Sequence, residues 1–308
     1  MVPAAPTKDW PQGLRVASYN IHKGVLGMGP AKRLRIHALQ EGLRGLGADV
    51  VLLQEVQFEH RRNAQRFASW PVLPQHELLG QGLGMFAAYH TNAHTRHGEH
   101  GNALLSRFPI LGISHQDVSD HRFEQRGLLH ARLAVPRDAL AGAPARVLHC
   151  VVVHFGLFRS GRRRQIQRLA EYLAHQVPAD EPVIVGGDFN DWRGELGAEL
   201  GALGLLDVST RATPRVDARH PRWHQRMRTF PALLPLLPLD RIYVRGFAAH
   251  GVALGWGAEW ARLSDHAPLL VDLTPLPPAA HAARPGAAAQ GAAPIRRRDM
   301  TVAGGTGH

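Results

Sequence analysis

The stretch IVGGDFNDW, residues 184–192, joins an apolar run directly to a cluster of short polar side chains. Its first residues are typical of a buried strand, whereas Asp188, Asn190 and Asp191 follow without a spacer. The glycine pair at 186–187 indicates a sharp turn or the close approach of another group. A simple turn is one interpretation, because Gly, Asp and Asn are common in turns. The alternative is a rigid metal or phosphate site at a strand end.

Apolar runs recur along the chain and predict further buried strands, since they are rich in Val, Ile and Leu. They are LRVASYNI (14–21), ADVVLLQEV (48–56), NALLSRFPI (102–110), LLHARLAV (128–135), RVLHCVVVHF (146–155), PVIVGGDF (182–189), LDRIYV (239–244) and APLLVDL (267–273). Helical patterns occupy residues 162–177 and 31–47, and the latter places four leucines near one face: Leu34, Leu39, Leu43 and Leu46. Strands and helices in both halves predict an α/β sandwich of two packed sheets with outer helices.

The composition fits a globular domain with flanking segments. The 308 residues are 44% apolar and 20% charged, which suits one large domain or two small ones. We expect an N-terminal extension at 1–12, a folded domain at 13–273 and a disordered Pro/Ala/Gly-rich tail at 274–308. Residues 213–240 are proline-rich and predict a long loop packed over the domain.

Charge and cysteine content narrow the classes of partner. The chain lacks a run of about 18 apolar residues and a signal-like N-terminus, so we expect a cytoplasmic monomer with no integral membrane segment. The single cysteine, Cys150, lies in an apolar run, which excludes an internal disulfide and predicts a buried thiol. The net charge of +11 favours polyanionic partners, either nucleic acid or anionic lipid head groups.

Titratable or metal-binding side chains stand at the ends of several predicted strands. They are Asn20, His22, Glu55, His154, Asp188, Asn190, Asp240, Asp265 and His266. Oxygen and imidazole groups without cysteine suit a hard cation such as Mg²⁺, for which Mn²⁺ can substitute. Zinc is the alternative metal, because the stretch HTNAHTRHGEH offers His90, His94, His97 and His100.

The ordered series SYNIH, LQEV, GNALLSR, VVHFG, GGDFND, LDRIYV and SDHAPL resembles the endonuclease/exonuclease/phosphatase superfamily. The resemblance spans residues 14–273. Within the superfamily, the pattern of the whole domain is most similar to a deoxyribonuclease-like bacterial subgroup of phosphodiesterases. It implies a four-layered αββα sandwich with two packed mixed β-sheets. It also implies a metal-dependent hydrolase that acts on phosphoric ester bonds by in-line attack of water.

The resemblance implies roles for individual residues on the metal side of the site. Glu55 is similar to the principal metal ligand of the family, with Asn20 beside it and Asp265 completing the shell. Asp188 and Asn190 resemble the pair that orients the attacking water and contacts the phosphate.

The resemblance also implies roles on the phosphate side. His266 is similar to the essential histidine next to the scissile phosphate, and Asp240 to the carboxylate that fixes its tautomer. His154 and Arg126 resemble groups that contact phosphate oxygens. In the deoxyribonuclease branch a glutamate stands near the position of His100, so the pairing of His154 depends on whether Glu99 substitutes for it.

Three functions remain open from the sequence. A phosphodiester hydrolase with nucleic acid as substrate is favoured over one that acts on phospholipid or small phosphoesters, because of the positive charge and the deoxyribonuclease-like LDRIYV. The stretch FPALLPLLPLD, residues 230–240, packs on the core in one interpretation and contacts lipid in the other. A non-catalytic nucleic-acid-binding protein is the alternative of another class.

Overall fold

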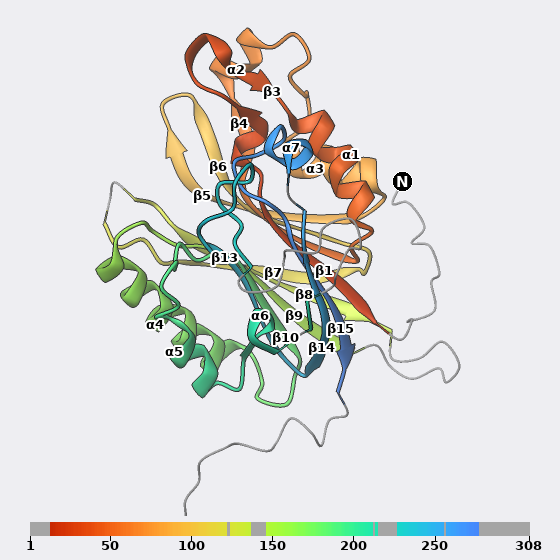
Figure 1. The fold of residues 1–308 in the computed structure, drawn as a ribbon, viewed down its shortest axis with the longest axis vertical. Coiled ribbons are helices and arrows are strands. Elements are labelled where there is room, and N and C mark those ends of the chain that lie inside the picture. Colours follow the sequence, from red (N-terminus) through yellow and green to blue (C-terminus); the bar gives the residue numbers. More distant parts are fainter. Residues whose placement is uncertain are drawn as a thin grey trace, which may run out of the picture.

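The structure, a computed structural model, describes residues 13–121, 124–136, 146–211, 213–214, 227–255 and 257–276. Two mixed β-sheets pack face to face, with helices on both outer faces (Figure 1). This is the four-layered αββα sandwich that the resemblance implied. The predicted extension at 1–12, residues 215–226 of the predicted long loop and residues 277–308 of the predicted tail lie outside the described residues. Residues 274–275, which were predicted to begin the tail, belong instead to the last strand of the first sheet.

The first sheet has seven strands, which stand in the order β12 (Thr213–Pro214), β14 (Phe247–Leu254), β15 (Leu269–Pro275), β1 (Leu14–Asn20), β4 (Val50–His60), β6 (Gly98–Ser106) and β5 (Phe86–Thr95). The second has six, in the order β11 (Leu206–Asp207), β13 (Asp240–Arg245), β10 (Val183–Asp188), β9 (Arg146–His154), β8 (Gly127–Val135) and β7 (Ile110–Asp117). In each sheet a central pair is parallel, β1 with β4 and β9 with β10. The short strands β2 (Val25–Leu26) and β3 (Arg33–Leu34) pair with each other.

Helices cover the outer faces of both sheets. Those of the first half are α1 (Ile36–Leu46), α2 (Arg61–Arg66) and α3 (Gln75–Leu83), with the 3₁₀ turns η1 (His22–Gly24) and η2 (Gly29–Ala31). Those of the second half are α4 (Arg159–Gln176), α5 (Gly197–Ala202), α6 (Val208–Arg211) and α7 (Ala258–Ala261). In Figure 1, α1 and α3 lie over the first sheet, while α4 and α5 lie over the second.

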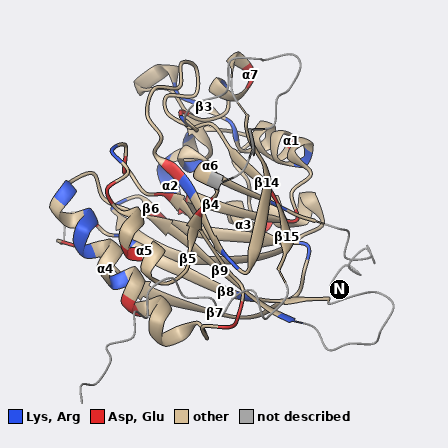
Figure 2. Ribbon diagram, turned by 60° about the horizontal axis from the view of Figure 1, so that its bottom comes forward, with Lys and Arg blue, Asp and Glu red and all other residues tan. Residues whose placement is uncertain are grey.

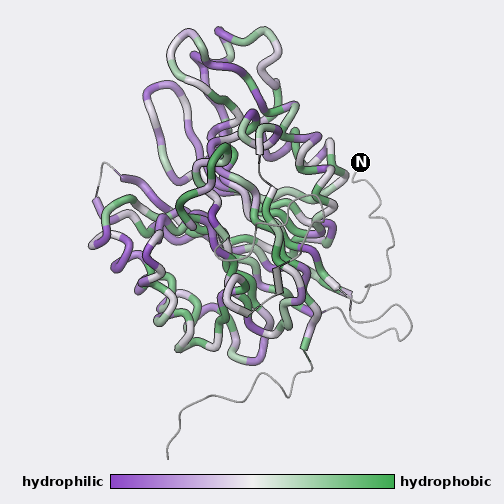
Figure 3. The backbone as a smooth tube through the Cα atoms, viewed as in Figure 1, coloured by the Kyte–Doolittle hydropathy of each residue, from purple (hydrophilic) through white to green (hydrophobic). Residues whose placement is uncertain are grey.

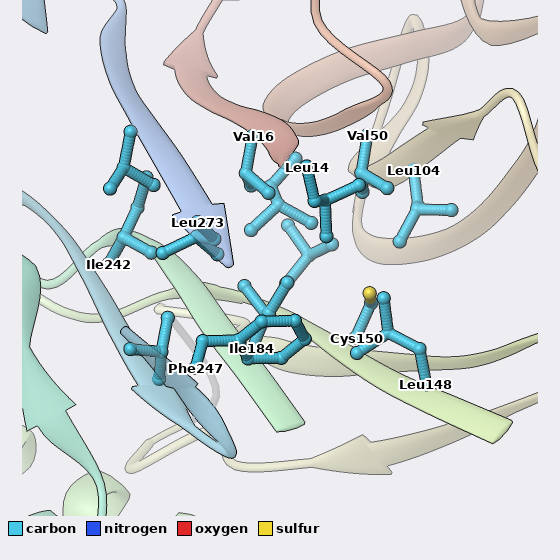
Figure 4. Close-up of a cluster of buried hydrophobic side chains, with 14 of the residues drawn as sticks. Leu14, Val16, Val50, Leu104, Leu148, Cys150, Ile184, Ile242, Phe247 and Leu273 are labelled. Atoms are coloured by element: carbon cyan, nitrogen blue, oxygen red, sulfur yellow. The ribbon is translucent and has the colours of Figure 1, made fainter. Parts of the chain in front are cut away.

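The main hydrophobic core lies between the two sheets. Val16 and Leu104 of the first sheet meet Cys150, Ile184 and other side chains of the second (Figure 4). Cys150 is fully buried, as predicted, and burial raises the pKa of its thiol. The hydrophobic stretches of the chain gather in these central strands (Figure 3). Burial of the apolar faces on both sides explains why continuous apolar runs, and not alternating ones, mark the strands.

All eight predicted strands are present, but other expectations need correction. The helix predicted at 31–47 covers only Ile36–Leu46, and Leu34 belongs to β3 and not to the helical face. The strands β5, β7 and β14 were not predicted. Both β5 and β7 are edge strands with partly exposed side chains, so they lack a continuous apolar run.

The glycine pair of the opening stretch reflects close approach and not a turn. A Cβ on Gly187, whose φ is +151°, would lie 1.9 Å from the carbonyl oxygen of Val153. A Cβ on Gly186 would lie 2.5 Å from Leu52 Cδ1 in the other sheet. The strand therefore continues to Asp188 and brings it close to both neighbours.

Candidate active site

The second sheet sets three polar residues in one row. Asp188, the last residue of β10, is aligned with His154 of β9 on one side and with Asp240 of β13 on the other. Side chains of residues directly opposite in neighbouring strands point to the same face of the sheet. All three are buried, so the row is rigid and shielded from bulk water.

The first sheet faces this row with residues from the ends of its parallel pair. Asn20 ends β1, and its Nδ2 donates a hydrogen bond to Asp188 Oδ2 at 3.2 Å. Glu55 lies in β4 at an irregularity of the pairing with β6, between Leu53 and Val56. A β-bulge of this kind redirects a side chain, and here it accompanies a left-handed backbone at Glu55, with φ of +56°.

His266 joins the two sides of the site. It lies between α7 and β15, and its Nδ1 donates to Asp240 Oδ2 at 2.8 Å. Its Nε2 lies 3.7 Å from Asp188 Oδ2, so the imidazole stands between two buried carboxylates. The Ser264 hydroxyl donates to the carbonyl oxygen of Asn20 at 2.7 Å, which ties this segment to β1.

The buried charges shift the pKa values of this group. Burial lowers the pKa of His266, but the carboxylates of Asp240 and Asp188 outweigh it, so the pKa lies above its ordinary value. Burial, with the charge of Asp240, raises the pKa of Asp188, although His266 and the hydrogen bonds from Asn190 and Asn20 oppose the rise. A protonated His266 between the two carboxylates is therefore the favoured state near neutral pH.

Strained backbone is concentrated around the site. Among the non-glycine residues that the structure describes, positive φ values occur at His22, Lys23, Glu55 and Asn190. Such conformations cost of order 1 kcal/mol each or more and persist where the surrounding structure fixes them. Asn190 is fixed by its backbone N–H, which donates to Asp188 Oδ1 at 3.0 Å, and by its Nδ2, which donates to the carbonyl oxygen of Phe155 at 2.9 Å.

The two carboxylates of the first-sheet side are held by basic neighbours. Lys23 Nζ lies 2.6 Å from Glu55 Oε2, and His22 Nδ1 lies 3.0 Å from Asp265 Oδ2. Burial raises the pKa of Glu55, but the charge of Lys23 prevails and holds it well below its usual range. Glu55 also repels Asp265 electrostatically, so both carboxylates contribute to one negative region.

This region offers oxygen donors for a hard cation. Within the described residues no group of three or more His, Cys, Asp and Glu side chains forms a metal cage. Glu55, Asp265 and the amide oxygen of Asn20 are a smaller set, in which Asn20 Oδ1 already accepts from the His22 N–H at 3.1 Å. Mg²⁺ commonly uses one or two carboxylates and keeps several waters, so these donors fit it.

His154 and Arg126 stand on the other side of Asp188. His154 Nε2 lies 3.6 Å from Asp188 Oδ2, and burial together with the charge of Arg126 lowers the pKa of His154 well below its usual value. Arg126 Nη2 lies 3.7 Å from Glu124 Oε1, while its buried Nε makes no hydrogen bond within the described part of the chain. This orphaned donor is available to an anionic oxygen.

Two residues of the site were not predicted, and one residue of the opening stretch has a local role. Lys23 was missed, although it is one of three lysines in a chain that uses arginine for almost every positive charge. Ser264 was missed because serine next to aspartate is common in loops. Asp191 does not face the site, since its two oxygens accept from the N–H groups of Gly194 and Leu196.

The four histidines of the alternative zinc site do not converge. His90 stacks on His115, His94 pairs with Glu99 at 3.1 Å, and His97 stacks on His60. Only His100 turns toward the site, where Glu55 and Arg126 influence its pKa; burial is the main cause that lowers this pKa to about 4.

Glu99 pairs with His94 and not with His154, so it does not take the place of the deoxyribonuclease glutamate. His100, on the same strand, is the residue that faces the site at this position. The carboxylate nearest to His154 among the ion pairs of the described residues is that of Asp188.

Comparison with known proteins identifies the family of the chain. Residues 17–266 match the family described as Endonuclease/Exonuclease/phosphatase family. The chain belongs to the endonuclease/exonuclease/phosphatase family. Membership in this family indicates hydrolysis of phosphoester bonds. The uncharacterized protein YbhP of Escherichia coli K12 is similar to this family member, with 37% identity over 260 residues, which cover 84% of this chain and 95% of that protein.

Solved structures share the fold of this endonuclease/exonuclease/phosphatase chain at low identity. A D. rerio TDP2 complexed with single-strand DNA product has a TM-score of 0.58 and 19% identity, and covers 85% of this chain and 99% of that one. A Bacteroides thetaiotaomicron mannosyl-6-phosphatase has a TM-score of 0.57 and 18% identity, with the same coverage. The fold therefore carries more than one phosphoester substrate, and the site of each chain must decide its chemistry.

Proposed function

We propose that the protein is a Mg²⁺-dependent phosphodiester hydrolase with nuclease-like chemistry, in which water attacks phosphorus in line with the leaving oxygen. The observation that carries this proposal is the line Asp240–His266–Asp188, which lies close to the acidic region formed by Glu55 and Asp265. It combines a protonated imidazole, a buried carboxylate and a separate acidic region in one small volume. These are the groups that an anionic phosphodiester requires.

Glu55, Asn20 and Asp265 would hold the cation, and Mn²⁺ would substitute for Mg²⁺. When bound, the cation supplies positive charge that offsets the negative charge of the phosphate oxygens. Lys23 pairs with Glu55 and His22 contacts Asp265, and the pKa of each carboxyl group lies below its ordinary value despite burial, so the acidic groups stay ionised before any cation binds. The partly buried carboxylates of Glu55 and Asp265 thereby stay in the charged form that a divalent cation needs.

Asp188 is suited to align and deprotonate the attacking water. Its Oδ1 and Oδ2 accept hydrogen bonds from the backbone N–H of Asn190 and from Asn20 Nδ2, which fix the plane of the carboxylate. Burial raises its pKa above the ordinary value, which makes it a stronger base than an exposed aspartate. An oriented base of this kind contributes about 10²-fold to 10⁴-fold to a rate.

The phosphate oxygens would be bound by three groups on the opposite side. Protonated His266 offers its Nε2–H, since its Nδ1–H is taken by Asp240. Arg126 offers its unpaired Nε–H, and neutral His154 can donate one hydrogen bond. Preorganised donors stabilise charge that develops in the transition state, and each is worth several kcal/mol, on the order of 10²-fold in rate.

Nucleic acid is the proposed substrate, and phospholipid is the second candidate. The net charge of +11 supports a polyanion, as does the fold shared with a protein that was solved with single-strand DNA product. One specific observation favours phospholipid. In the loop of residues 229–239, which lies next to His266, four leucines are exposed.

Hydrolysis assays separate these possibilities. Bis(p-nitrophenyl) phosphate, plasmid DNA and phosphatidylglycerol vesicles are each incubated with Mg²⁺, Mn²⁺ or EDTA, with His266→Ala as the inactive variant. His175→Ala, an exposed histidine of α4, is the matched control. Metal-dependent cleavage of DNA supports the nuclease, and cleavage of lipid alone moves the substrate to phospholipid. Equal activity of His266→Ala and His175→Ala would contradict the site.

A further inference from the structure

An apolar loop stands next to the candidate active site. We call residues 229–239, TFPALLPLLPL, the leucine loop; it contains no charged residue. Leu233, Leu234, Leu236 and Leu237 are 36% to 67% exposed, although each is a large apolar side chain. The expectation that this stretch packs on the core therefore fails at its tip. Exposed apolar clusters of this kind on a folded protein commonly mark an interaction site.

The leucine loop is an ordered element that is anchored to the catalytic machinery. The Phe230 and Leu237 backbones exchange hydrogen bonds of 3.1 and 2.8 Å, which close the loop into a compact turn. The Ala232 N–H donates to the carbonyl oxygen of Asp265 at 2.7 Å, and the Phe230 ring lies 5.0 Å from the His266 ring, centroid to centroid. The leucines are thus held outward on a fixed base beside the site.

A second apolar group stands beyond the ends of neighbouring strands. Leu157 and Phe158 follow His154 of β9, and Trp192 follows Asp188 of β10; we call these three residues the aromatic corner. They are 40% to 64% exposed. Arg162 links them, because its guanidinium lies 4.7 Å from the centroid of the Trp192 ring and donates to the carbonyl oxygen of Leu157. The aromatic corner is therefore also held in place.

Positive charge surrounds the aromatic corner. Residues 157–168 and 192–195 contain six arginines and one glutamate, and Glu195 pairs with Arg159 and Asp120 with Arg164, so positive charge remains in excess. Figure 2 shows the basic positions along α4. Arg163 is exposed on α4, and Arg228 is exposed immediately before the leucine loop. Both apolar groups thus have exposed arginine close to them in the chain.

We propose that the leucine loop and the aromatic corner together dock the protein on an anionic phospholipid bilayer. The two apolar groups stand at the same end of the second sheet, where the Phe189 N–H donates to the carbonyl oxygen of Leu239 at 2.9 Å. Two separate apolar projections suit a deformable bilayer surface better than one complementary protein face. Exposed Leu, Phe and Trp insert into the interfacial region of a bilayer, while arginine binds anionic head groups. The docking does not depend on the proposed hydrolysis, because binding to vesicles is measured without turnover.

Vesicle co-sedimentation of the full-length protein tests this docking. Vesicles of phosphatidylcholine alone are compared with vesicles that also contain phosphatidylglycerol. The variant Leu233→Ser/Leu234→Ser removes two leucines of the loop tip. The matched control is Leu111→Ser/Ile113→Ser, which changes two apolar residues of the edge strand β7 that are 54% and 51% exposed. Thermal unfolding reports that each variant retains its fold, and bis(p-nitrophenyl) phosphate hydrolysis reports its catalytic site separately.

The wild type should bind phosphatidylglycerol vesicles more strongly than phosphatidylcholine vesicles. The loop variant should lose about tenfold or more in partition coefficient, since each buried leucine contributes on the order of a tenfold preference. The control should bind like the wild type, and both variants should still cleave the soluble diester. The proposal is overturned by a wild type that binds no vesicles, or by equal losses in the two variants. Loop-dependent self-association or oligonucleotide binding without vesicle binding would also overturn it.

Discussion

The two sheets place their functional side chains by different physical means. In the second sheet, His154, Asp188 and Asp240 lie in one row through ordinary strand pairing, and all are buried. In the first sheet, Glu55 depends on a β-bulge and a left-handed backbone, and it is partly exposed beside Lys23. Regular pairing holds the groups that need fixed mutual distances. Strained backbone presents Glu55, the carboxylate that we propose as a cation ligand.

The charged groups of the two regions also differ in how firmly they are held. In the row, the carboxylates of Asp240 and Asp188 both lie next to the imidazole of His266. Deletion of one of these side chains therefore leaves a buried charge without its partner. On the first-sheet side, Lys23 pairs with Glu55 and His22 contacts Asp265 at partly exposed positions, and water or a cation can replace these contacts. We therefore expect a deletion at the centre of the row to have a larger effect than substitutions around Glu55.

The largest effect is expected at the centre of the row. Asp188→Ala should lower kcat for bis(p-nitrophenyl) phosphate by about 10³-fold to 10⁴-fold, because it removes both the base and the partner of His266 Nε2. Asp191→Ala is a control with a neighbouring carboxylate that binds only backbone N–H groups. It should retain most of the activity per folded molecule and lose stability. A larger loss of kcat in Asp191→Ala would reverse the roles assigned to the two residues.

A smaller loss is expected on the first-sheet side. Glu55→Gln keeps the shape of the side chain but removes its charge, so the Mg²⁺ concentration for half-maximal activity should rise by about tenfold to a hundredfold. Glu59→Gln, an exposed position of the same strand, should leave the Mg²⁺ dependence unchanged. Titration of activity with Mg²⁺ measures this difference. If raising Mg²⁺ restores nothing in Glu55→Gln and the half-maximal concentration is unchanged, Glu55 does not hold the cation.

Sequence reasoning predicted the row better than the strained side. The buried strands were visible because apolar runs end at His154 and Asp188, and these ends fall side by side in a parallel pair. No residue type in the sequence marks the bulge at Glu55 or the left-handed backbone at Lys23, since neither residue is a glycine. The leucine loop was ambiguous for a related reason. Exposed and buried leucines are identical in sequence, and only tertiary packing decides which they are.

The row should also respond to the loss of its outer carboxylate. Asp240 raises the pKa of His266, so Asp240→Asn should lower this pKa and move the alkaline limit of activity to lower pH. A loss of about tenfold to a hundredfold in kcat should accompany the shift, because the amide no longer stabilises the imidazolium. Asp272→Asn, at the surface pair with Arg15, is the control. An unchanged pH profile in Asp240→Asn would mean that His266 does not act in its protonated form.

The same pair predicts how stability depends on pH. The folded-state pKa of His266 lies above its ordinary value, so the folded state binds the proton more tightly than the unfolded state. Its contribution is complete below the unfolded pKa of about 6.5 and is lost as pH rises through the folded pKa. The difference in unfolding free energy between wild type and Asp240→Asn should shrink over that interval. Denaturant unfolding at several pH values measures it.

The smallest expected effect is on stability, and it measures the backbone strain at Lys23 on the first-sheet side. Lys23 has φ of +60° and ψ of +19°, a left-handed conformation that glycine adopts without cost. Lys23→Gly and Lys23→Ala both remove the ion pair with Glu55, so their difference reports the backbone alone. The glycine variant should be more stable by about 1 to 2 kcal/mol. Gln167, exposed in the middle of α4, should show the opposite order, with Ala more stable than Gly by about 1 kcal/mol. Denaturant unfolding of the four variants tests both signs. An alanine at residue 23 as stable as the glycine would show that this side of the site stores no strain, and the contrast between the two sheets would then rest on charge and exposure alone.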